Sequence, residues 1–450
     1  MMNLNNAPAM IDPATAGGGT PKRPLRLSMP FLSLCFAFIL VRLPFMFTVP
    51  MVEAPDEFAH FWVLRFMRDY LRLPTAAEVA AGGPSAVYGS LPQLGYLPHV
   101  AIGLVTPIHD ISLFARFGSL LMGLVLLYAS YHIGSLIFRD NRLLAFALPA
   151  IVVFHPQLAF LHSYANSDAT ATALGAVILL LALRSIASGI TIYRCLVIGL
   201  LMGWLALSKY SGLGVMPAIA FTLVASAVLN RQSPGKVVAA LAVCGTAAAA
   251  VSGWWFVRNY HEYNGDFMGT QTMYRSWAMT FHREMNYQVP ASHIIKDLRW
   301  WRMMFFSFWG LFGYMNKYLW RPVYFVYLGY LIVATVGGVK TLYQFARAKA
   351  RVMTRQDWEV GIAWTCIALT VSLNLAAMVW ASTKNLGGPQ GRYLFPSEIP
   401  VIALLLLGMN GVSARWSRVL VASFVGFNVV VCLGSWFWLF SMYGFHARPL

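Results

Sequence analysis

Charged residues are scarce in this sequence of 450 residues, since they make up 11% of it and only 16 of them are acidic. Soluble domains carry roughly 25% charged residues. Hydrophobic residues make up 58% of the chain. They come in runs of about 18 to 25 residues, the length that crosses a hydrocarbon core about 30 Å thick. The composition therefore excludes a soluble globular enzyme and predicts an all-α polytopic membrane protein.

The sequence also lacks the marks of a disulfide framework and of a cleaved signal peptide. Its five cysteines lie in apolar runs, without metal-site spacing or pairing near a loop, so we interpret them as packing residues. The first apolar run, near residues 29–49, is too long for a signal-peptide core and has no A-x-A-like cleavage site. We therefore expect a disordered cytoplasmic tail at residues 1–28 and a single transmembrane domain over residues 29–450.

About eleven apolar runs are present, and each predicts a membrane span. They lie near residues 29–49, 112–138, 143–161, 169–186, 194–211, 213–230, 237–256, 322–340, 359–381, 393–411 and 418–441. With a cytoplasmic N-terminus, every cytoplasmic connection carries at least two Lys or Arg, as the positive-inside rule requires. The net charge of +17 thus follows membrane topology and does not indicate a nucleic-acid partner. The opposite face receives two long outer loops, residues 50–111 and 257–321.

Two stretches in these outer loops are expected to form helices that do not span the membrane, the first interfacial or re-entrant and the second interfacial. Residues 100–106 are apolar but short, and prolines bracket them on both sides. Residues 300–320 are rich in aromatic side chains, which favour the membrane interface. If this second stretch crossed the bilayer, the basic residues between 340 and 355 would lie on the outer face.

The sequence Pro55-Asp56-Glu57-Phe58-Ala59-His60 follows the first span on the outer face. If a helix begins at Pro55, Asp56 and His60 share one face of it. Such a cluster suits a general base or a divalent cation. The alternative is that the acids only stabilise the positive end of a helix.

Single basic residues stand at outer helix ends, against the general charge bias. They are Lys209, Arg258 and Arg392. A phosphate at headgroup depth would explain them through charge-assisted hydrogen bonds. The alternative for each is a side chain that snorkels to the interface. Arg42 lies inside the first span, and we expect it to snorkel or to pair with a nearby acid.

Taken in order, these motifs resemble the GT-C glycosyltransferases, a superfamily that includes protein O-mannosyltransferases and the lipid A aminoarabinose transferase. The matching segments are Asp56-Glu57, Asn166 with Asp168, Ser208-Lys209-Tyr210-Ser211-Gly212 and Gly391-Arg392-Tyr393-Leu394-Phe395-Pro396. A bacterial branch labelled as a domain of unknown function is more closely similar, through Trp254-Trp255, Arg258-Asn259, Gly265-Asp266 and the segment from Ser307 to Gly313. The resemblance covers nearly the whole chain.

The resemblance implies a GT-C fold in the bacterial inner membrane. It also implies inverting transfer of a hexose or pentose, on the periplasmic face, from a polyprenyl-phosphate monosaccharide to a glycan or lipid-linked acceptor. Asp56 would be the general base, worth roughly 10² to 10⁴ in rate, and Glu57 a metal ligand or orienting group. The expected donor-phosphate residues are Lys209, Arg258, Arg392, Tyr393 and Tyr210. The expected substrate contacts are His60, Asn166, Asp168 and Gln390.

Three questions stay open at this point. A divalent metal is possible, because His60, His162, Asp168, His261 and Asp266 could complete a site with the two acids, but no ligand spacing establishes one. A transporter or flippase of a lipid-linked sugar would use the same cations, although we find no internal repeat of the kind carriers usually show. An inactive scaffold is the third reading.

Overall fold

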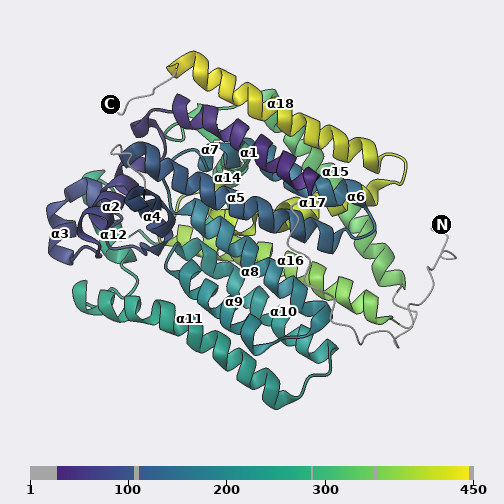
Figure 1. The fold of residues 1–450 in the computed structure, drawn as a ribbon. Helices are drawn as coiled ribbons and strands as arrows, with labels where there is room; N and C mark the ends of the chain where they lie inside the picture. The colour runs from purple at the N-terminus through teal and green to yellow at the C-terminus, as the bar shows by residue number, and fades with distance from the viewer. Residues whose placement is uncertain (1–27, 106–110, 285–286, 349–352, 445–450) are drawn as a thin grey trace.

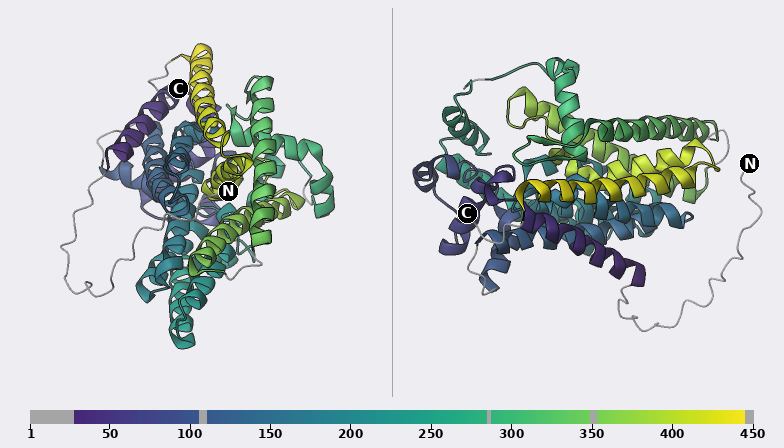
Figure 2. Two further views of the ribbon diagram at one scale, coloured as in Figure 1. Left: turned by 90° about the vertical axis from the view of Figure 1, so that its right-hand side faces the viewer. Right: turned by 90° about the horizontal axis from the view of Figure 1, so that it is seen from above.

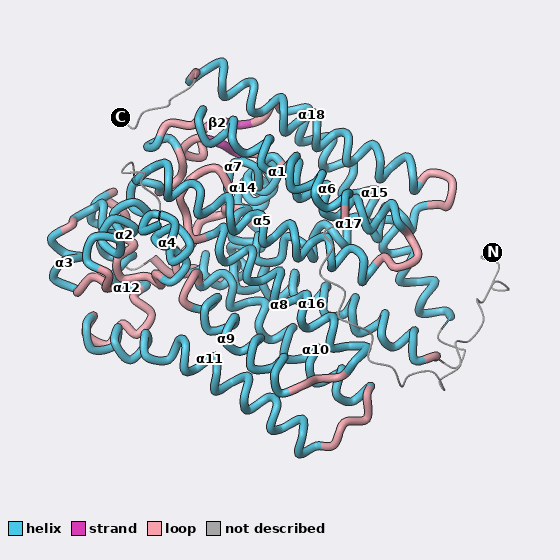
Figure 3. Tube along the Cα trace, viewed as in Figure 1, coloured by secondary structure: helices cyan, strands magenta, loops and turns pink. Residues whose placement is uncertain are grey.

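The computed structural model describes residues 28–105, 111–284, 287–348 and 353–444, and it is a bundle of helices (Figure 1). Most of the predicted tail, residues 1–27, lies outside the described part. The main helices of the bundle are α1 (Met29–Thr48), α5 (Ile111–Ile137), α8 (Asp168–Ser188), α10 (Met216–Leu229), α11 (Pro234–Glu262), α15 (Arg321–Ala348), α16 (Arg355–Thr383), α17 (Glu398–Val412) and α18 (Ser417–Tyr443). A 3-10 turn precedes α10 and another precedes α17, and each turn extends its segment to the length of a span. The described residues contain one two-stranded antiparallel ladder, β1 (Leu311–Phe312) with β2 (Lys317–Tyr318), drawn in magenta in Figure 3.

Every predicted span is helical, but not every one is long. Within the described residues, nine segments are long and apolar enough to cross a membrane. The run at 143–161 is split into α6 (Arg142–Phe154) and α7 (Pro156–Leu161), and the run at 194–211 contains α9 (Ile192–Ala206). The polytopic helical architecture is therefore confirmed, whereas the count of eleven full-length spans is not.

The bundle has two different ends. At one end, which we call the turn end, the short connections meet: Arg355 donates hydrogen bonds to the carbonyl of Ala187, 3.2 Å away, and to Asn230 Oδ1, 2.7 Å away. The opposite end, which we call the loop end, carries α2 (Glu57–Tyr70), α3 (Ala76–Ala81), α4 (Leu97–Val105) and α12 (Thr270–Thr280) (Figures 1 and 2). The predicted separation of short basic connections from long loops is thus present in the fold.

The two expected interfacial helices exist as short elements. The first, α4, has nine residues. The second, α14 (Leu298–Trp309), has twelve and covers only the first half of the expected stretch, because the second half contains the β1–β2 ladder. Helix α14 follows α13 (Ala291–Lys296). Both are too short to cross a hydrocarbon core, which needs about 20 helical residues. Their position at a membrane interface stays a prediction.

Arg42 does not behave as predicted. Its side chain is fully buried and donates hydrogen bonds to the carbonyls of Val153, at 2.5 Å, and Val152, at 2.8 Å. Pro156 has no N–H to bond the carbonyl four residues earlier, so α6 ends with free acceptors inside the bundle. The expectation of snorkelling or an acid partner was wrong, because Arg42 satisfies these carbonyls.

Candidate functional site

Asp56 is placed by an unusual backbone conformation where α1 gives way to α2. Its φ is 60° and its ψ is 9°, the left-handed region that Asp tolerates better than most residues. Helix α2 begins at Glu57 and not at Pro55, and Asp56 is its N-cap residue without a capping hydrogen bond from its side chain. The carboxylate is therefore directed away from its own helix and is available to other elements.

Arg392 is the partner of Asp56. Its Nη2 lies 2.6 Å from Asp56 Oδ2. It belongs to η6 (Gly391–Ser397), and its Nε donates to Gln390 Oε1 at 2.6 Å. Burial tends to raise the pKa of Asp56, but the charge and hydrogen bond of Arg392 lower it below the usual value of an aspartate. The Asp56 carboxylate is thus ionised at neutral pH.

A second pair continues from the first. Lys209 Nζ lies 2.6 Å from Asp168 Oδ1, and Asp168 Oδ2 lies 3.9 Å from Arg392 Nη1. Charges therefore alternate along Asp56, Arg392, Asp168 and Lys209, four side chains that we call the charged row. Its two ends are the more exposed members: 27% of the Asp56 side chain and 19% of the Lys209 side chain are accessible, against 5% and 2% for Arg392 and Asp168. A ligand would reach the row at these ends.

Aromatic hydroxyls and one imidazole surround the row. Tyr164 OH accepts from Arg392 Nη1 at 3.4 Å, and the Tyr393 ring lies 5.0 Å from Lys209 Nζ. His60 Nδ1 lies 2.5 Å from Tyr96 OH. Burial first, and then the nearby Lys209 charge, holds the pKa of His60 well below its usual value. His60 is therefore a neutral hydrogen-bonding group beside the row.

Glu57 lies next to Asp56 in sequence but serves a different pair. Both of its carboxylate oxygens accept hydrogen bonds from Arg116, at 3.0 and 2.8 Å, and Oε1 also accepts from the Ala165 N–H at 2.9 Å. Arg116 in turn donates to the carbonyls of Met46 and Val49, at 2.6 and 2.8 Å. This pair ties the end of α1 to α5 and to the loop before α8.

Asn166 is also occupied by the backbone of that loop. Its Nδ2 donates to the carbonyls of Leu161 and Tyr164, and its Oδ1 accepts from the Ala169 N–H, with distances of 2.8, 2.8 and 2.9 Å. This explains how Asp168 is presented to Lys209: Asn166 fixes the turn that begins α8.

Arg258 and Tyr210 form a separate group. Arg258, on α11, donates to the Pro74 carbonyl and to Asn259 Oδ1, and it lies over the ring of Trp255. Trp255 Nε1 donates to Tyr210 OH, which donates to the Met268 carbonyl at 2.7 Å. Within the described residues, no hydrogen bond or ion pair joins this group to the charged row. Of the five expected phosphate residues, the structure thus brings together Lys209, Arg392 and Tyr393.

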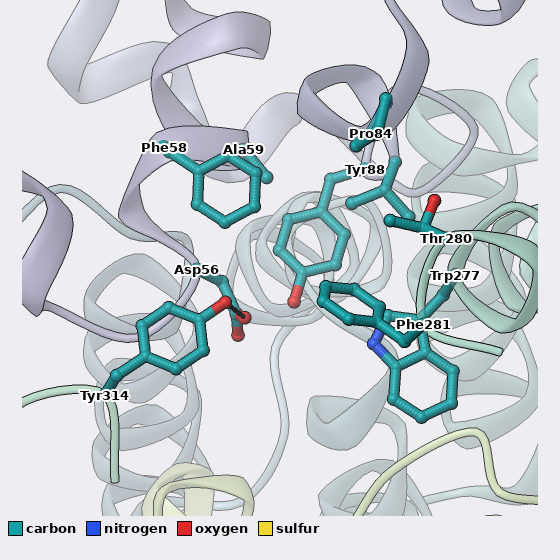
Figure 4. Close-up of a pocket in the computed structure, with 10 residues that line it drawn as sticks. Asp56, Phe58, Ala59, Pro84, Tyr88, Trp277, Thr280, Phe281 and Tyr314 are labelled. Atoms are coloured by element: carbon teal, nitrogen blue, oxygen red, sulfur yellow. Dashed lines mark hydrogen bonds between the residues drawn. The ribbon is translucent and has the colours of Figure 1, made fainter. Parts of the chain in front are cut away.

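A pocket opens beside Asp56 at the loop end, and we call it the aromatic pocket (Figure 4). Segments from both outer loops line it, with the residues Asp56, Phe58, Ala59, Pro84, Val87, Tyr88, Trp277, Thr280, Phe281 and Tyr314. The Tyr314 hydroxyl donates to Asp56 Oδ1, at 3.5 Å. Sequence reasoning missed Tyr88, Trp277, Phe281 and Tyr314. No spacing could have revealed them, because they come from separate loop segments.

The segment from Ser307 to Gly313 holds η6 in place. Ser307 Oγ accepts a hydrogen bond from the Gly391 N–H at 2.8 Å, and a Cβ on Gly391 would collide with the backbone of Phe308. On the other side, the Leu311 N–H donates to Gln157 Oε1 at 2.6 Å. The segment therefore affects the charged row indirectly, because it fixes the loop that carries Arg392.

The described residues offer no ready metal site. Among them, no group of three or more His, Cys, Asp or Glu lies close enough to hold a metal ion. Asp56 and Asp168 already have Arg392 and Lys209 as counter-ions. A divalent cation would have to displace these partners, so the residues do not fit one.

Comparison with solved structures identifies the architecture. ArnT from Cupriavidus metallidurans, bound to undecaprenyl phosphate, superposes with a TM-score of 0.52 at 15% sequence identity, over 86% of this chain. The chain has the GT-C fold. It spans 62% of the length of that ArnT chain. At 15% sequence identity, the similarity to ArnT shows the fold alone.

Two further matches are weaker. Apo ArnT from the same organism gives a TM-score of 0.40 at 14% identity, covering 85% of this chain and 78% of that one. The Archaeoglobus fulgidus oligosaccharyltransferase, in complex with Zn and sulfate, gives 0.47 at 12% identity, covering 94% of this chain and 54% of that one. No protein-family model matches the sequence, and no curated protein matches it significantly.

Proposed function

We propose that the protein is an inverting membrane glycosyltransferase that moves a sugar from a polyprenyl-phosphate monosaccharide to a hydroxyl group. One observation carries the proposal: Asp56 stands between a cationic group and an open pocket. Its Oδ2 is bound to Arg392, while its Oδ1 lies on the side of Tyr314, which lines the pocket. The GT-C fold, shared with a protein that binds undecaprenyl phosphate, agrees with this assignment.

Asp56 is the general base in this proposal. An acceptor hydroxyl attacks the anomeric carbon as its proton passes to Asp56, and the bond between that carbon and the phosphate oxygen breaks. The ionised state of Asp56, maintained by Arg392, is the state that can accept the proton. Positioned proton transfer of this kind is worth roughly 10² to 10⁴ in rate.

Lys209 and Arg392 would hold the leaving phosphate. An ammonium has three N–H donors, and Lys209 uses one of them on Asp168 while its side chain stays 19% accessible. Arg392 Nη1 has only longer contacts, 3.4 Å to Tyr164 and 3.9 Å to Asp168. Both cations can therefore add a phosphate oxygen, which stabilises the leaving charge without protonation.

The proposed location is a bacterial inner membrane, with a cytoplasmic N-terminus and the active site in the periplasm. The basic connections gather at the turn end, and Asp56 of the charged row directly precedes α2, which lies at the loop end (Figure 1). By the positive-inside rule the turn end faces the cytoplasm. The acceptor in this setting is a glycan or a lipid-linked glycan of the cell envelope.

Reconstitution tests the proposal against the flippase alternative. Proteoliposomes carrying the wild-type protein and undecaprenyl-phosphate sugars, with envelope glycan as acceptor, should release undecaprenyl phosphate and form a glycoside. Asp56→Asn should do neither, while Asp69→Asn, an exposed acid on α2, should match the wild type. Movement of the glycolipid across the bilayer without a new glycosidic bond would assign the site to transport.

A further inference from the structure

We infer that the aromatic pocket binds an uncharged sugar ring of the acceptor, so that the substrate receiving the new sugar is itself a neutral carbohydrate at the reacting hydroxyl. This inference rests on the proposed function and names the acceptor's chemistry. Three observations support it: the residues that line the pocket, the charge of that lining and the Asp56 oxygen that faces the pocket.

The walls of the pocket offer aromatic faces from two segments of the second outer loop. Trp277 and Phe281 come from α12 and the residue following it, with ring centroids 5.7 Å apart, and Tyr314 comes from the turn after β1. Phe281 is 48% exposed and Tyr314 is 44% exposed, so these faces are open to a ligand. The electron-rich face of an aromatic ring attracts the positively polarised C–H groups on one face of a sugar.

Polar groups at the same pocket suit the hydroxyls of a sugar. Tyr88, Tyr314 and Thr280 each bring a hydroxyl, and Asp56 brings a carboxylate (Figure 4). A few placed polar groups among apolar walls are typical of small-molecule sites. Thr280 donates to the Ser276 carbonyl and Tyr314 donates to Asp56, but each hydroxyl oxygen can still accept a hydrogen bond from a sugar hydroxyl, which a lipid tail cannot offer.

The charge of the lining favours a neutral ligand. Asp56 is its single charged residue, and no Lys, Arg or His is among the described residues that line the pocket. The cations of the charged row contact the other oxygen of Asp56 or lie beyond it. An anionic group in the pocket would therefore approach Asp56 from the side away from Arg392. Arg283 lies 5.9 Å from the centre of the Trp277 ring but is not part of the lining.

The two oxygens of Asp56 separate donor from acceptor. Oδ2 faces Arg392, the proposed phosphate partner, and Oδ1 faces Tyr314 in the pocket. The oxygen free to take a proton is thus the one that a ring in the pocket would meet. This geometry assigns the pocket to the acceptor and not to the sugar of the donor.

Saturation-transfer NMR on the full-length protein in nanodiscs tests the inference without any turnover. The probes are methyl β-D-glucopyranoside and methyl α-D-mannopyranoside, with methyl β-D-glucuronide as the anionic analogue. We expect the neutral probes to bind through ring C–H protons, and Trp277→Ala to weaken them about fivefold or more. Trp277→Phe keeps an aromatic face and should retain most of the binding. Trp320→Ala, at an exposed tryptophan outside the pocket, should have no effect.

Several outcomes would overturn the assignment. They are binding of neither neutral probe, unchanged binding in both Trp277→Ala and Phe281→Ala, or a glucuronide that binds more tightly than the glucoside. Displacement of the glucoside by undecaprenyl-phosphate glucose, but not by undecaprenyl phosphate, would show that the pocket binds the sugar of the donor. We expect the glucoside to remain bound with either lipid.

The role of Asp56 is tested separately from the pocket. Asp56→Asn should abolish transfer yet still bind the glucoside, and it should bind the glucuronide better than the wild type does, because the repelling charge is gone. Pyranoside binding together with full transfer activity in Asp56→Asn would refute the proposed mechanism and leave the sugar site standing.

Discussion

Two arginine–carboxylate pairs lie side by side at the start of α2, and they differ in what surrounds them. In the pair of Glu57 with Arg116, both partners are closed off, with side-chain exposures of 0% and 7%. In the pair of Asp56 with Arg392, the carboxylate side chain is 27% exposed and its other partners are the hydroxyls of two residues that line the pocket, Tyr314 and Tyr88. Neighbouring acids with the same kind of partner thus differ in hydrogen-bonding capacity left for a substrate.

The difference lies in the kind of partner that the second oxygen of each acid has, because Arg116 and the backbone occupy both oxygens of Glu57, whereas Oδ1 of Asp56 meets a pocket hydroxyl that a substrate can replace. Glu57 accepts two from Arg116 and one from the backbone, which leaves little for a ligand. A buried pair of this kind fixes structure, and removing one partner leaves an uncompensated charge. Asp56 keeps one oxygen for chemistry. We therefore expect variants of the first pair to lower stability and variants of the second to lower transfer.

The largest effect is expected for Arg116→Ala. It leaves Glu57 buried and unpaired, so we expect about 3–5 kcal/mol of lost stability, the range for breaking a buried ion pair. Thermal unfolding in detergent, compared with the exposed Arg65→Ala variant on α2, measures it. A melting temperature equal to that of Arg65→Ala would show that the pair of Glu57 with Arg116 does not stabilise the fold.

Asp56→Asn is expected to lower transfer at least about a hundredfold, the lower end for losing a general base. Its melting temperature should fall less than that of Arg116→Ala, because the amide fills the same space and Arg392 keeps Asp168 nearby. Its affinity for undecaprenyl phosphate should stay near that of the wild type. Initial rates of undecaprenyl phosphate release give the comparison. Near-normal transfer would show that Asp56 is not the general base and that the two acids do not differ in function.

Arg392→Ala should weaken binding of undecaprenyl phosphate by roughly 1.5–3 kcal/mol, the range for a hydrogen bond to a charged group. Arg392→Lys should rescue only part of this loss, since an ammonium lacks the planar fork that grips two oxygens. Titrations in nanodiscs measure both variants. Wild-type affinity in both Arg392→Ala and Lys209→Ala would contradict the phosphate assignment.

The smallest effect concerns pH. Arg392 lowers the pKa of Asp56 against the effect of burial, so the base loses its function only as pH falls through a value below the usual 3.9 or so. The pair also stabilises the fold above the pKa of the unfolded chain and loses that contribution in the same acid range. His60 stays neutral because its pKa is depressed.

Transfer rates should therefore be flat between about pH 5 and pH 8. His60→Gln should give the same profile as the wild type. An inflection near the ordinary histidine pKa of about 6.5 in the wild type, absent from His60→Gln, would show that His60 titrates during catalysis.

The sequence could predict the helices and the members of the charged row better than their contacts. Lys209 and Arg392 stood out because cations are rare at outer helix ends. That Arg392 pairs with Asp56, 336 residues earlier in the chain, depends on helix packing that no local spacing encodes. For the same reason Arg258 was grouped with them, although its hydrogen bonds go to Pro74 and Asn259.

The aromatic pocket was beyond sequence reasoning for a different reason. Aromatic residues are 14% of the chain, and most of them serve packing or the membrane interface. Tyr88 and Trp277 differ from the others only in their position beside Asp56 in the folded chain. A helix boundary at Pro156 can be predicted from the sequence. That Arg42 of α1 bonds the free carbonyls at the end of α6 depends on how the two helices pack, which the sequence does not show.

The bonds of Arg42 also bear on the order in which the protein is made. During synthesis α1 leaves the ribosome more than 100 residues before Val152 and Val153, the carbonyls that its arginine needs. A central arginine costs about 2.5–3.5 kcal/mol on translocon insertion scales. The apolar residues of α1, with a mean hydropathy of 2.0, outweigh this cost and favour insertion of the helix. Its arginine nevertheless stays without these carbonyl partners until α6 has been made, so a later helix completes the packing of the first span.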